Sequence, residues 1–309
     1  MSGFPSFRAL APAKVNLGLF VGETRDSDGR HELLSVMQSI SLADELLLQP
    51  ASAGASADEL HCPGLPGPPA ENLAARALAA FRAATGWDAP PLRLSVEKRI
   101  PVAAGLGGGS ADAAAALRLA QRASGLGDQS LLSELGASLG ADVPAQVSPG
   151  RWLASGAGEQ LAPLPDPLPA LELLVLPSAE QLSTAAVYAA ADQLGVAREQ
   201  DELEHARGQL QRAFELGAPL PAARELLHND LQQAALSLQP AIARALTAVR
   251  DAGAELALVS GSGPTVIGLF GHANAAGRVQ RALLELSANE PAPLAASSVG
   301  AAFGEVVEL

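Results

Sequence analysis

Four glycines stand directly before a serine and an alanine-rich stretch in the segment PVAAGLGGGSADAAAA, residues 101–116. Glycine permits positive φ angles and close approach of the backbone to an anion. The free N–H groups at the start of a helix, together with the helix dipole, attract phosphate oxygens. This spacing therefore predicts a phosphate-binding loop, although a flexible turn between a strand and a helix has a similar composition.

The loop differs from two common nucleotide-binding motifs. Ala113, and not a lysine, follows the glycines, so the P-loop pattern fails. The dinucleotide pattern fails as well, because Gly105 and Gly107 are followed by Ser110 instead of a third glycine. The positive charge that a P-loop lysine supplies must then come from Mg²⁺ and from basic residues elsewhere in the chain.

Lysine is rare in this chain, because Lys14 and Lys98 are the only lysines among the 20 basic residues. Lysine brings a compact charge to a phosphate or carboxylate, whereas arginine is a planar fork. Lys98 lies just before the glycine loop. Lys14 alternates with Asn16 along a predicted strand, so both side chains are expected on one face. The alternative is that the two lysines have no functional role and remain by chance in a chain whose composition favours arginine.

Composition narrows the class of protein. A chain of 309 residues can form two domains, and 7 Phe, 2 Trp and 1 Tyr imply cores of Leu, Val and Ala. A net charge of −13 argues against a sequence-independent nucleic-acid or anionic-membrane surface. The single Cys62 fits a reducing compartment, so we expect a cytoplasmic protein. We expect no signal peptide and no membrane-spanning segment. We also expect no metal site built from a cluster of histidines.

The elements expected around these residues alternate between strand and helix. We predict strands at 92–100, 171–176, 256–260 and 265–270, and helices at 71–85, 110–123, 131–139, 184–194 and 226–238. Ser110 is expected to cap the helix after the glycine loop. A crossing between two domains is expected at Pro163, Pro165, Pro167 and Pro169. The prediction is an α+β fold with domains 1–160 and 161–309.

Four separated segments together resemble the GHMP kinases: PAKVNLGL at 12–19, the glycine loop, LGADVP at 139–144 and LVSGSGPTVIGLF at 258–270. Within that superfamily, DGRHEL at 28–33, ENL at 71–73 and HNDL at 228–231 are similar to the family that phosphorylates the 2-hydroxyl of 4-diphosphocytidyl-2-C-methyl-D-erythritol in the non-mevalonate isoprenoid pathway. The resemblance implies ATP and Mg²⁺ as cofactors. It also implies an N-terminal domain of the ribosomal-protein-S5 domain-2 type, a ferredoxin-like C-terminal domain, and an active site in the cleft between them.

The resemblance further implies roles for individual residues. Phosphoryl transfer needs a group that takes the proton of the attacking alcohol and a cation near the phosphoryl group. Asp142 stands at the position of the base, Lys14 at that of the cation, and Asn16 where the substrate is oriented. A helix-end aspartate and a strand-end asparagine are the structural alternatives. Residues expected on the ATP side are Asn72, Lys98, Pro101, Val102, Ala103, Ala104, Gly105, Leu106, Gly107, Gly108, Gly109, Ser110 and Ala111.

The expected cytidine pocket uses His31 for the base edge and Tyr188 for stacking, with Thr184 one helical turn earlier. Arg30 stands where the family usually has a second stacking tyrosine. A guanidinium can stack on a pyrimidine and adds charge for a diphosphate. Ala111 likewise stands where a second serine is common. Solvated turn residues beside a core aromatic are the alternative interpretation.

Two rival functions are weighed against this one. Another GHMP kinase, acting on homoserine or mevalonate, would be favoured by absence of the DGRHEL and HNDL segments and of Tyr188. A non-catalytic ligand sensor on the same fold would be expected to lose Asp142 or Lys14. The expected partners are ATP and a small-molecule substrate, without nucleic acid or membrane. The sequence does not determine the oligomeric state.

Overall fold

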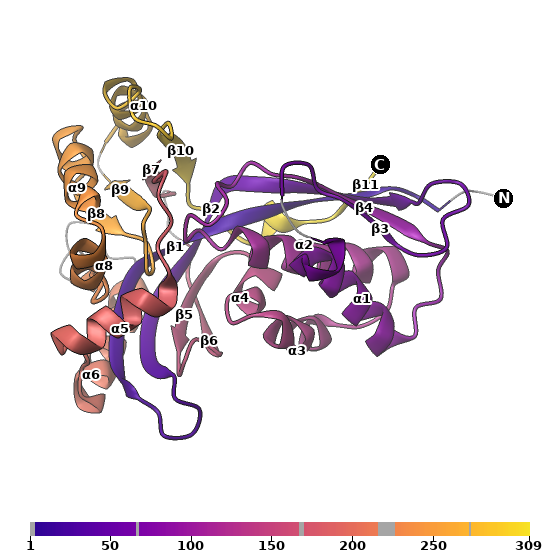
Figure 1. The fold of residues 1–309 in the computed structure, drawn as a ribbon, viewed down its shortest axis with the longest axis horizontal. Helices are drawn as coiled ribbons and strands as arrows, with labels where there is room; N and C mark the ends of the chain where they lie inside the picture. Colours follow the sequence, from indigo (N-terminus) through magenta and orange to yellow (C-terminus); the bar gives the residue numbers. More distant parts are fainter. Residues whose placement is uncertain (1–3, 66–67, 167–169, 216–225, 272) are drawn as a thin grey trace.

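A computed structural model describes residues 4–65, 68–166, 170–215, 226–271 and 273–309. Its strands form two sheets (Figure 1). The strands of the larger sheet are β1 (Phe7–Thr24), β2 (His31–Pro50), β3 (Glu59–His61), β4 (Leu92–Glu97), β5 (Arg151–Ser155), β6 (Gln160–Leu164) and β11 (Val307–Glu308). Their order is β11-β1-β2-β4-β3, while β5 pairs with β2 and β6 pairs with β5.

A long antiparallel hairpin of β1 and β2 reaches from the larger sheet toward the other half of the molecule (Figure 1). Its register shifts between Pro12 and Lys14, again between Asn16 and Gly18, and a third time near its tip. Such irregularities bend a strand and redirect its side chains. The first two shifts lie on either side of Lys14 and Asn16. The strand is therefore irregular at the two residues of the hairpin that are predicted to belong to the active site.

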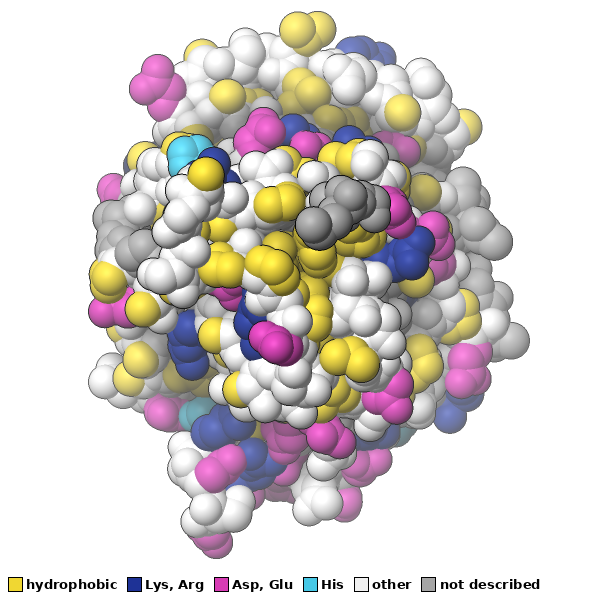
Figure 2. All heavy atoms as spheres, turned by 90° about the vertical axis from the view of Figure 1, so that its right-hand side faces the viewer, with side chains coloured by type: hydrophobic (Ala, Val, Ile, Leu, Met, Phe, Trp, Pro, Cys, Tyr) yellow, Lys and Arg dark blue, Asp and Glu magenta, His cyan; other side chains and the backbone are white. Residues whose placement is uncertain are grey.

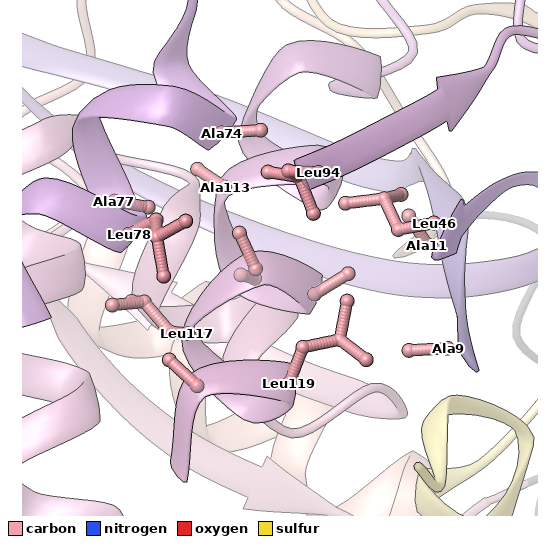
Figure 3. Packing of buried hydrophobic residues seen from close by; sticks show 14 of the residues in the cluster. Ala9, Ala11, Leu46, Ala74, Ala77, Leu78, Leu94, Ala113, Leu117 and Leu119 are labelled. Atoms are coloured by element: carbon pink, nitrogen blue, oxygen red, sulfur yellow. The ribbon is translucent and has the colours of Figure 1, made fainter. Parts of the chain in front are cut away.

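Four helices pack beside the larger sheet: α1 (Leu73–Thr85), α2 (Gly108–Ser124), α3 (Gln129–Leu139) and α4 (Val143–Val147). The core that they share with the strands consists mainly of small and aliphatic side chains, as Figure 3 shows for Ala113 and Leu117 of α2, Leu78 of α1, and Leu46 and Leu94 of the sheet. Because α2 is so rich in alanine, it can approach its neighbours closely on several sides. The expected Leu, Val and Ala cores are therefore confirmed.

The smaller sheet holds β7 (Glu172–Leu176), β8 (Leu256–Val259), β9 (Val266–Phe270) and β10 (Leu294–Ser297) in the antiparallel order β10-β7-β9-β8. This order is that of a ferredoxin-like sheet, so the predicted second domain is confirmed. The helices after β7 are α5 (Thr184–Leu194), α6 (Gln200–Glu215), α8 (Gln232–Leu238), α9 (Ala241–Asp251) and α10 (Ala275–Glu285). Helices α9 and α10 contact this sheet, and α6 contacts the β1–β2 hairpin.

The two sheets share a buried cluster that includes Val15 and Val36 of the hairpin and Leu173 and Ile267 of the smaller sheet. In the larger sheet, β6 begins at Gln160 and continues past this boundary, and β11 lies near the end of the chain. The division into 1–160 and 161–309 stays a prediction. Of the prolines expected to mark the crossing, Pro163 lies within β6, and Pro167 and Pro169 lie outside the described residues.

Two local predictions are wrong. Helix α2 begins at Gly108 with Gly107 as its cap, so Ser110 lies inside the first turn and does not cap it. Helix α8 begins at Gln232, and not at 226, because Asn229 instead forms a bridge with Leu19 of β1. In both places a long-range contact decides where the helix starts.

On the face of the molecule shown in Figure 2, Lys and Arg side chains lie dispersed among Asp and Glu side chains and do not gather into one patch. No helix among the described residues is long and apolar enough to cross a membrane.

Candidate active site

The glycine loop has the geometry that its composition predicts. Gly105 and Gly107 adopt φ angles of +74° and +68°. A Cβ on Gly105 would lie 2.6 Å from the carbonyl oxygen of Gly263, and one on Gly107 would lie 2.9 Å from Cγ of Lys14. Both positions therefore exclude a side chain. The loop ends at the start of α2, whose first N–H groups have no partner within the helix and are available to an anion.

Two other segments hold this loop in place. The backbone N–H of Lys14 donates to the carbonyl of Leu106 at 2.9 Å, and the buried Thr265 hydroxyl donates to the carbonyl of Ala104 at 2.6 Å. Thr265 follows the 261–264 turn between β8 and β9. The close approach of Gly105 and Gly263 places this turn against the phosphate loop.

Lys14, Asn16 and Asp142 come together at the mouth of the loop. Nζ of Lys14 lies 2.8 Å from Oδ1 of Asn16 and 3.3 Å from Oδ2 of Asp142. The Lys14 side chain is 10% exposed and that of Asp142 is 38% exposed, so the ammonium is nearly covered while the carboxylate faces solvent. Asn16 is oriented in turn, since its Nδ2 donates to the Ser35 hydroxyl at 2.7 Å.

Helix α4 determines where the Asp142 carboxylate points. Asp142 precedes this five-residue helix, and its side chain makes no capping hydrogen bond. Pro144, in the first turn, costs no hydrogen bond there because its missing N–H would have no helical partner. The carboxylate thus pairs with Lys14 and not with the backbone of α4, which favours a functional role over a helix cap.

A cavity of about 620 Å³ connects the phosphate loop with the rest of the predicted site. Residues from both halves of the chain line it. They include Lys14, Asn16, Arg30, His31, Ser35, Gly105, Gly107, Asp142, Thr184, Tyr188, Gly261 and Ser262. Asp142, Lys14, the loop and the predicted cytidine residues thus share one cavity.

His31 and Tyr188, which both line this cavity, stack on each other with ring centroids 5.3 Å apart and planes at 28°. His31 is held by Gly22, whose carbonyl oxygen lies 2.9 Å from Nδ1, and by Asp192, whose Oδ1 lies 3.2 Å from Nε2. Nη2 of Arg30 donates to the carbonyl of Ala157 at 2.6 Å. His31 therefore covers one face of the tyrosine ring.

The remaining predicted residues surround the loop. The Thr184 hydroxyl lies 2.9 Å from that of Ser262 in the 261–264 turn. Asn72 caps α1, since its Oδ1 accepts from the N–H of Ala74 at 2.9 Å. Ala111 has a buried methyl group, and Val102 is exposed. Contact of these residues with a nucleotide stays a prediction.

Lys98 lies between two buried carboxylates behind the loop. Its Nζ is 2.5 Å from Asp44 and 2.7 Å from Asp112. It also lies 3.5 Å from where a Cβ of Gly108 would stand, close to the start of α2. Burial raises the pKa of Asp112 to about 7, and the nearby Asp44 carboxylate adds to the rise while Lys98 opposes it.

Asp112→Asn is expected to flatten part of the pH dependence of stability. The native carboxyl keeps its proton to about pH 7, whereas the unfolded one loses it near its ordinary pKa of 3.8. The free energy of unfolding therefore falls as pH rises between these values. Relative to the asparagine variant, the parent should lose roughly 2 kcal/mol between pH 5 and pH 7 in urea unfolding. Parallel profiles for the two proteins would contradict this assignment.

Sequence reasoning missed several residues that shape the site. Ser35 joins it through its register opposite Leu19 in the hairpin. Asn229 donates to the carbonyls of Val259 and Gly261 at 2.7 and 2.8 Å, and so holds the 261–264 turn. The HNDL segment was the available signal for Asn229. For Ser35 no local signal exists.

Comparison with known proteins agrees with this arrangement. The family model for the GHMP kinases N terminal domain matches residues 72–150, and the model for GHMP kinases C terminal matches residues 209–289. Fold and site together define a two-domain kinase of the GHMP type. A 4-diphosphocytidyl-2-C-methyl-D-erythritol kinase from Anaeromyxobacter dehalogenans is 42% identical over 268 residues, which cover 84% of this chain and 80% of that protein. The chain therefore belongs to the family of 4-diphosphocytidyl-2-C-methyl-D-erythritol kinases.

Solved structures extend the comparison. The crystal structure of a 4-(cytidine 5'-diphospho)-2C-methyl-D-erythritol kinase matches with a TM-score of 0.75 and 33% identity over 95% of this chain and 99% of that chain. A homoserine kinase from Cytophaga hutchinsonii matches with a TM-score of 0.74 at 16% identity over 98% of each chain. The second likeness shows the fold alone.

Proposed function

We propose that this protein transfers the γ-phosphoryl group of ATP to the 2-hydroxyl of 4-diphosphocytidyl-2-C-methyl-D-erythritol. The observation that carries the proposal is one cavity lined by the phosphate loop, by the Lys14–Asp142 pair, 3.3 Å apart, and by His31 and Tyr188. A sensor on this fold would not need a free carboxylate beside a covered ammonium. The homologous proteins at about 40% identity are named as kinases of this same substrate.

The residues of the cavity divide the work of phosphoryl transfer. Asp142 accepts the proton of the attacking hydroxyl as the bond from oxygen to the γ-phosphorus forms. Lys14 holds positive charge beside the transferred group, and Asn16 orients both Lys14 and the acceptor. The N–H groups at the start of α2 hold the phosphates that leave as ADP.

The residues also fit Mg²⁺ that arrives with ATP. No group of three or more His, Cys, Asp and Glu side chains suited to a metal occurs among the described residues. Mg²⁺ in nucleotide sites keeps several waters and binds chiefly substrate phosphates, so a dedicated cage is not required. We place the hydroxyl of Ser110, in the first turn of α2, as the side chain that would hold it. The bound ion would neutralise phosphate charge.

We place the cytosine of the substrate in the cavity beside Tyr188, with Arg30 on its other side. Hydrogen bonding of Arg30 to Ala157 holds the guanidinium at the edge of the cavity. In that position it can stack on a pyrimidine or contact the diphosphate.

Replacement of Arg30 separates these two roles. Arg30→Tyr is expected to keep KM for the cytidylyl substrate within a few-fold, because a tyrosine also stacks on cytosine. Arg30→Ala should raise that KM about tenfold through loss of a stacked cation. Steady-state kinetics with ATP at saturation measure both. A large loss in Arg30→Tyr with unchanged KM for ATP would assign Arg30 to the diphosphate instead.

The substrate itself is tested by ADP release. Purified protein is assayed with 4-diphosphocytidyl-2-C-methyl-D-erythritol, mevalonate and homoserine, and Asp142→Asn provides the blank. We expect turnover only with the cytidylyl compound. Turnover only with mevalonate or homoserine would overturn the proposal. We further propose a cytoplasmic location, on the single cysteine and the ATP requirement.

A further inference from the structure

One buried side chain near the site makes no hydrogen bond with either of its polar atoms. Gln146 is 1% exposed, and neither Oε1 nor Nε2 makes a hydrogen bond with any residue that the structure describes. Buried carboxamides are ordinarily paired, since an unpaired one loses its bonds to water without replacement. Each such group in a folded protein requires an explanation.

Gln146 lies directly behind the phosphate loop. Its Nε2 is 3.5 Å from the point where a Cβ of Gly107 would stand, and Cγ and Cε of Lys14 are 2.9 and 3.2 Å from that same point. The carboxamide therefore adjoins both the cap of α2 and the stem of Lys14. Gln146 lies on helix α4, which begins directly after Asp142.

The backbone of Gln146 is firmly held even though its side chain is unpaired. Arg118 of α2 donates from Nη1 to the carbonyl of Gln146 at 2.6 Å, and from Nη2 to the carbonyl of Leu10 at 2.8 Å. Arg118 thus ties α4 to β1. The carboxamide can reach a new hydrogen-bond partner by rotation of the side chain, without any movement of α4.

We propose that Gln146 is a positioning residue whose carboxamide makes its hydrogen bonds when nucleotide phosphates occupy the glycine loop. The inference rests on the proposed ATP-dependent function. Phosphates that bind the first N–H groups of α2 and the Lys14 ammonium draw these groups together. A carboxamide, which both donates and accepts, then pairs with the adjoining loop backbone and fixes the Lys14 stem. The free-energy cost of burying an unpaired carboxamide is thereby present in the nucleotide-free form and removed in the nucleotide-bound form.

Gln146→Met tests the proposal, because methionine keeps the length of the side chain and removes its polar atoms. The nucleotide-free variant should have a higher Tm than the parent, since an unpaired buried group is lost. Its KM for ATP should rise about tenfold, with a smaller change in kcat. The rise in Tm that saturating ATP causes should shrink. Gln146→Leu provides a second variant if the first does not fold.

A matched control uses a buried glutamine remote from the loop. Gln239 is 6% exposed, its Oε1 is unpaired and its Nε2 donates to Ser178. Gln239→Met should leave KM for ATP unchanged. If Gln146→Met raises Tm but keeps KM and the ATP-induced Tm rise within twofold of the parent, Gln146 only fills space and the inference is overturned. Absence of any ATP-induced rise in the parent would instead overturn the proposed function.

Discussion

Asp142→Asn is expected to lower kcat by roughly 10²- to 10⁴-fold, the usual contribution of a positioned general base. Asparagine keeps the size of the side chain and its place before α4, but it cannot accept the proton of the attacking hydroxyl. The side chain is 38% exposed toward the cavity and caps no helix, so the fold should not depend on its charge. ADP release gives kcat, and KM for ATP should stay close to that of the parent.

Another aspartate before a helix provides the control for this variant. Asp128 caps α3 by accepting from the N–H of Leu131 at 2.9 Å. Asparagine caps helices about as well as aspartate, so Asp128→Asn should change neither stability nor turnover appreciably. Near-normal turnover in Asp142→Asn would mean that another group is the base.

Lys14→Met is expected to have the second largest effect, a fall in kcat of about 10²- to 10³-fold. That is the range for removing one preorganised group that stabilises transition-state charge. The lysine stem packs on Gly107 and its Nζ bonds Asn16, so methionine preserves the packing and removes only the charge and its donors. Circular dichroism checks the fold and ADP release gives kcat. A kcat within threefold of the parent would contradict the assigned role.

The double variant decides whether the two residues act as one unit. If Lys14 serves the transfer that Asp142 initiates, removal of both should cost little more than removal of Asp142 alone, because effects within one catalytic unit are strongly non-additive. Losses in kcat that multiply would instead mean that each residue acts by itself.

Much of the fold and of the ATP side could be predicted from the chain, because those features depend on local chemistry. Glycine is required at 105 and 107 by positive φ angles and close contacts, and the alanine content of α2 permits its tight packing. Alternation along β1 likewise placed Lys14 and Asn16 on one face, and their hydrogen bond agrees. These are properties of a few neighbouring residues.

Other features depended on residues that are distant in the sequence. Ser110 was predicted as a cap, but Gly107 takes that place where the loop meets Lys14 and the 261–264 turn. Lys98 was assigned to the adenosine side, and the structure adds that Asp44 and Asp112 enclose its ammonium. No sequence pattern predicted a role for Gln146, since it is a single glutamine in a short apolar helix.

The sequence by itself determined the kind of chemistry: a phosphate loop without its own lysine, one candidate cation and one candidate base. Only the tertiary structure decided that these groups meet, with Lys14 on β1 and Asp142 before α4 brought to 3.3 Å beside a cavity that residues from both halves of the chain line. The physical reason is that residue type and spacing specify local backbone geometry. The separation of side chains from distant elements depends on hairpin register, buried packing and ties such as that of Arg118 between α4 and β1.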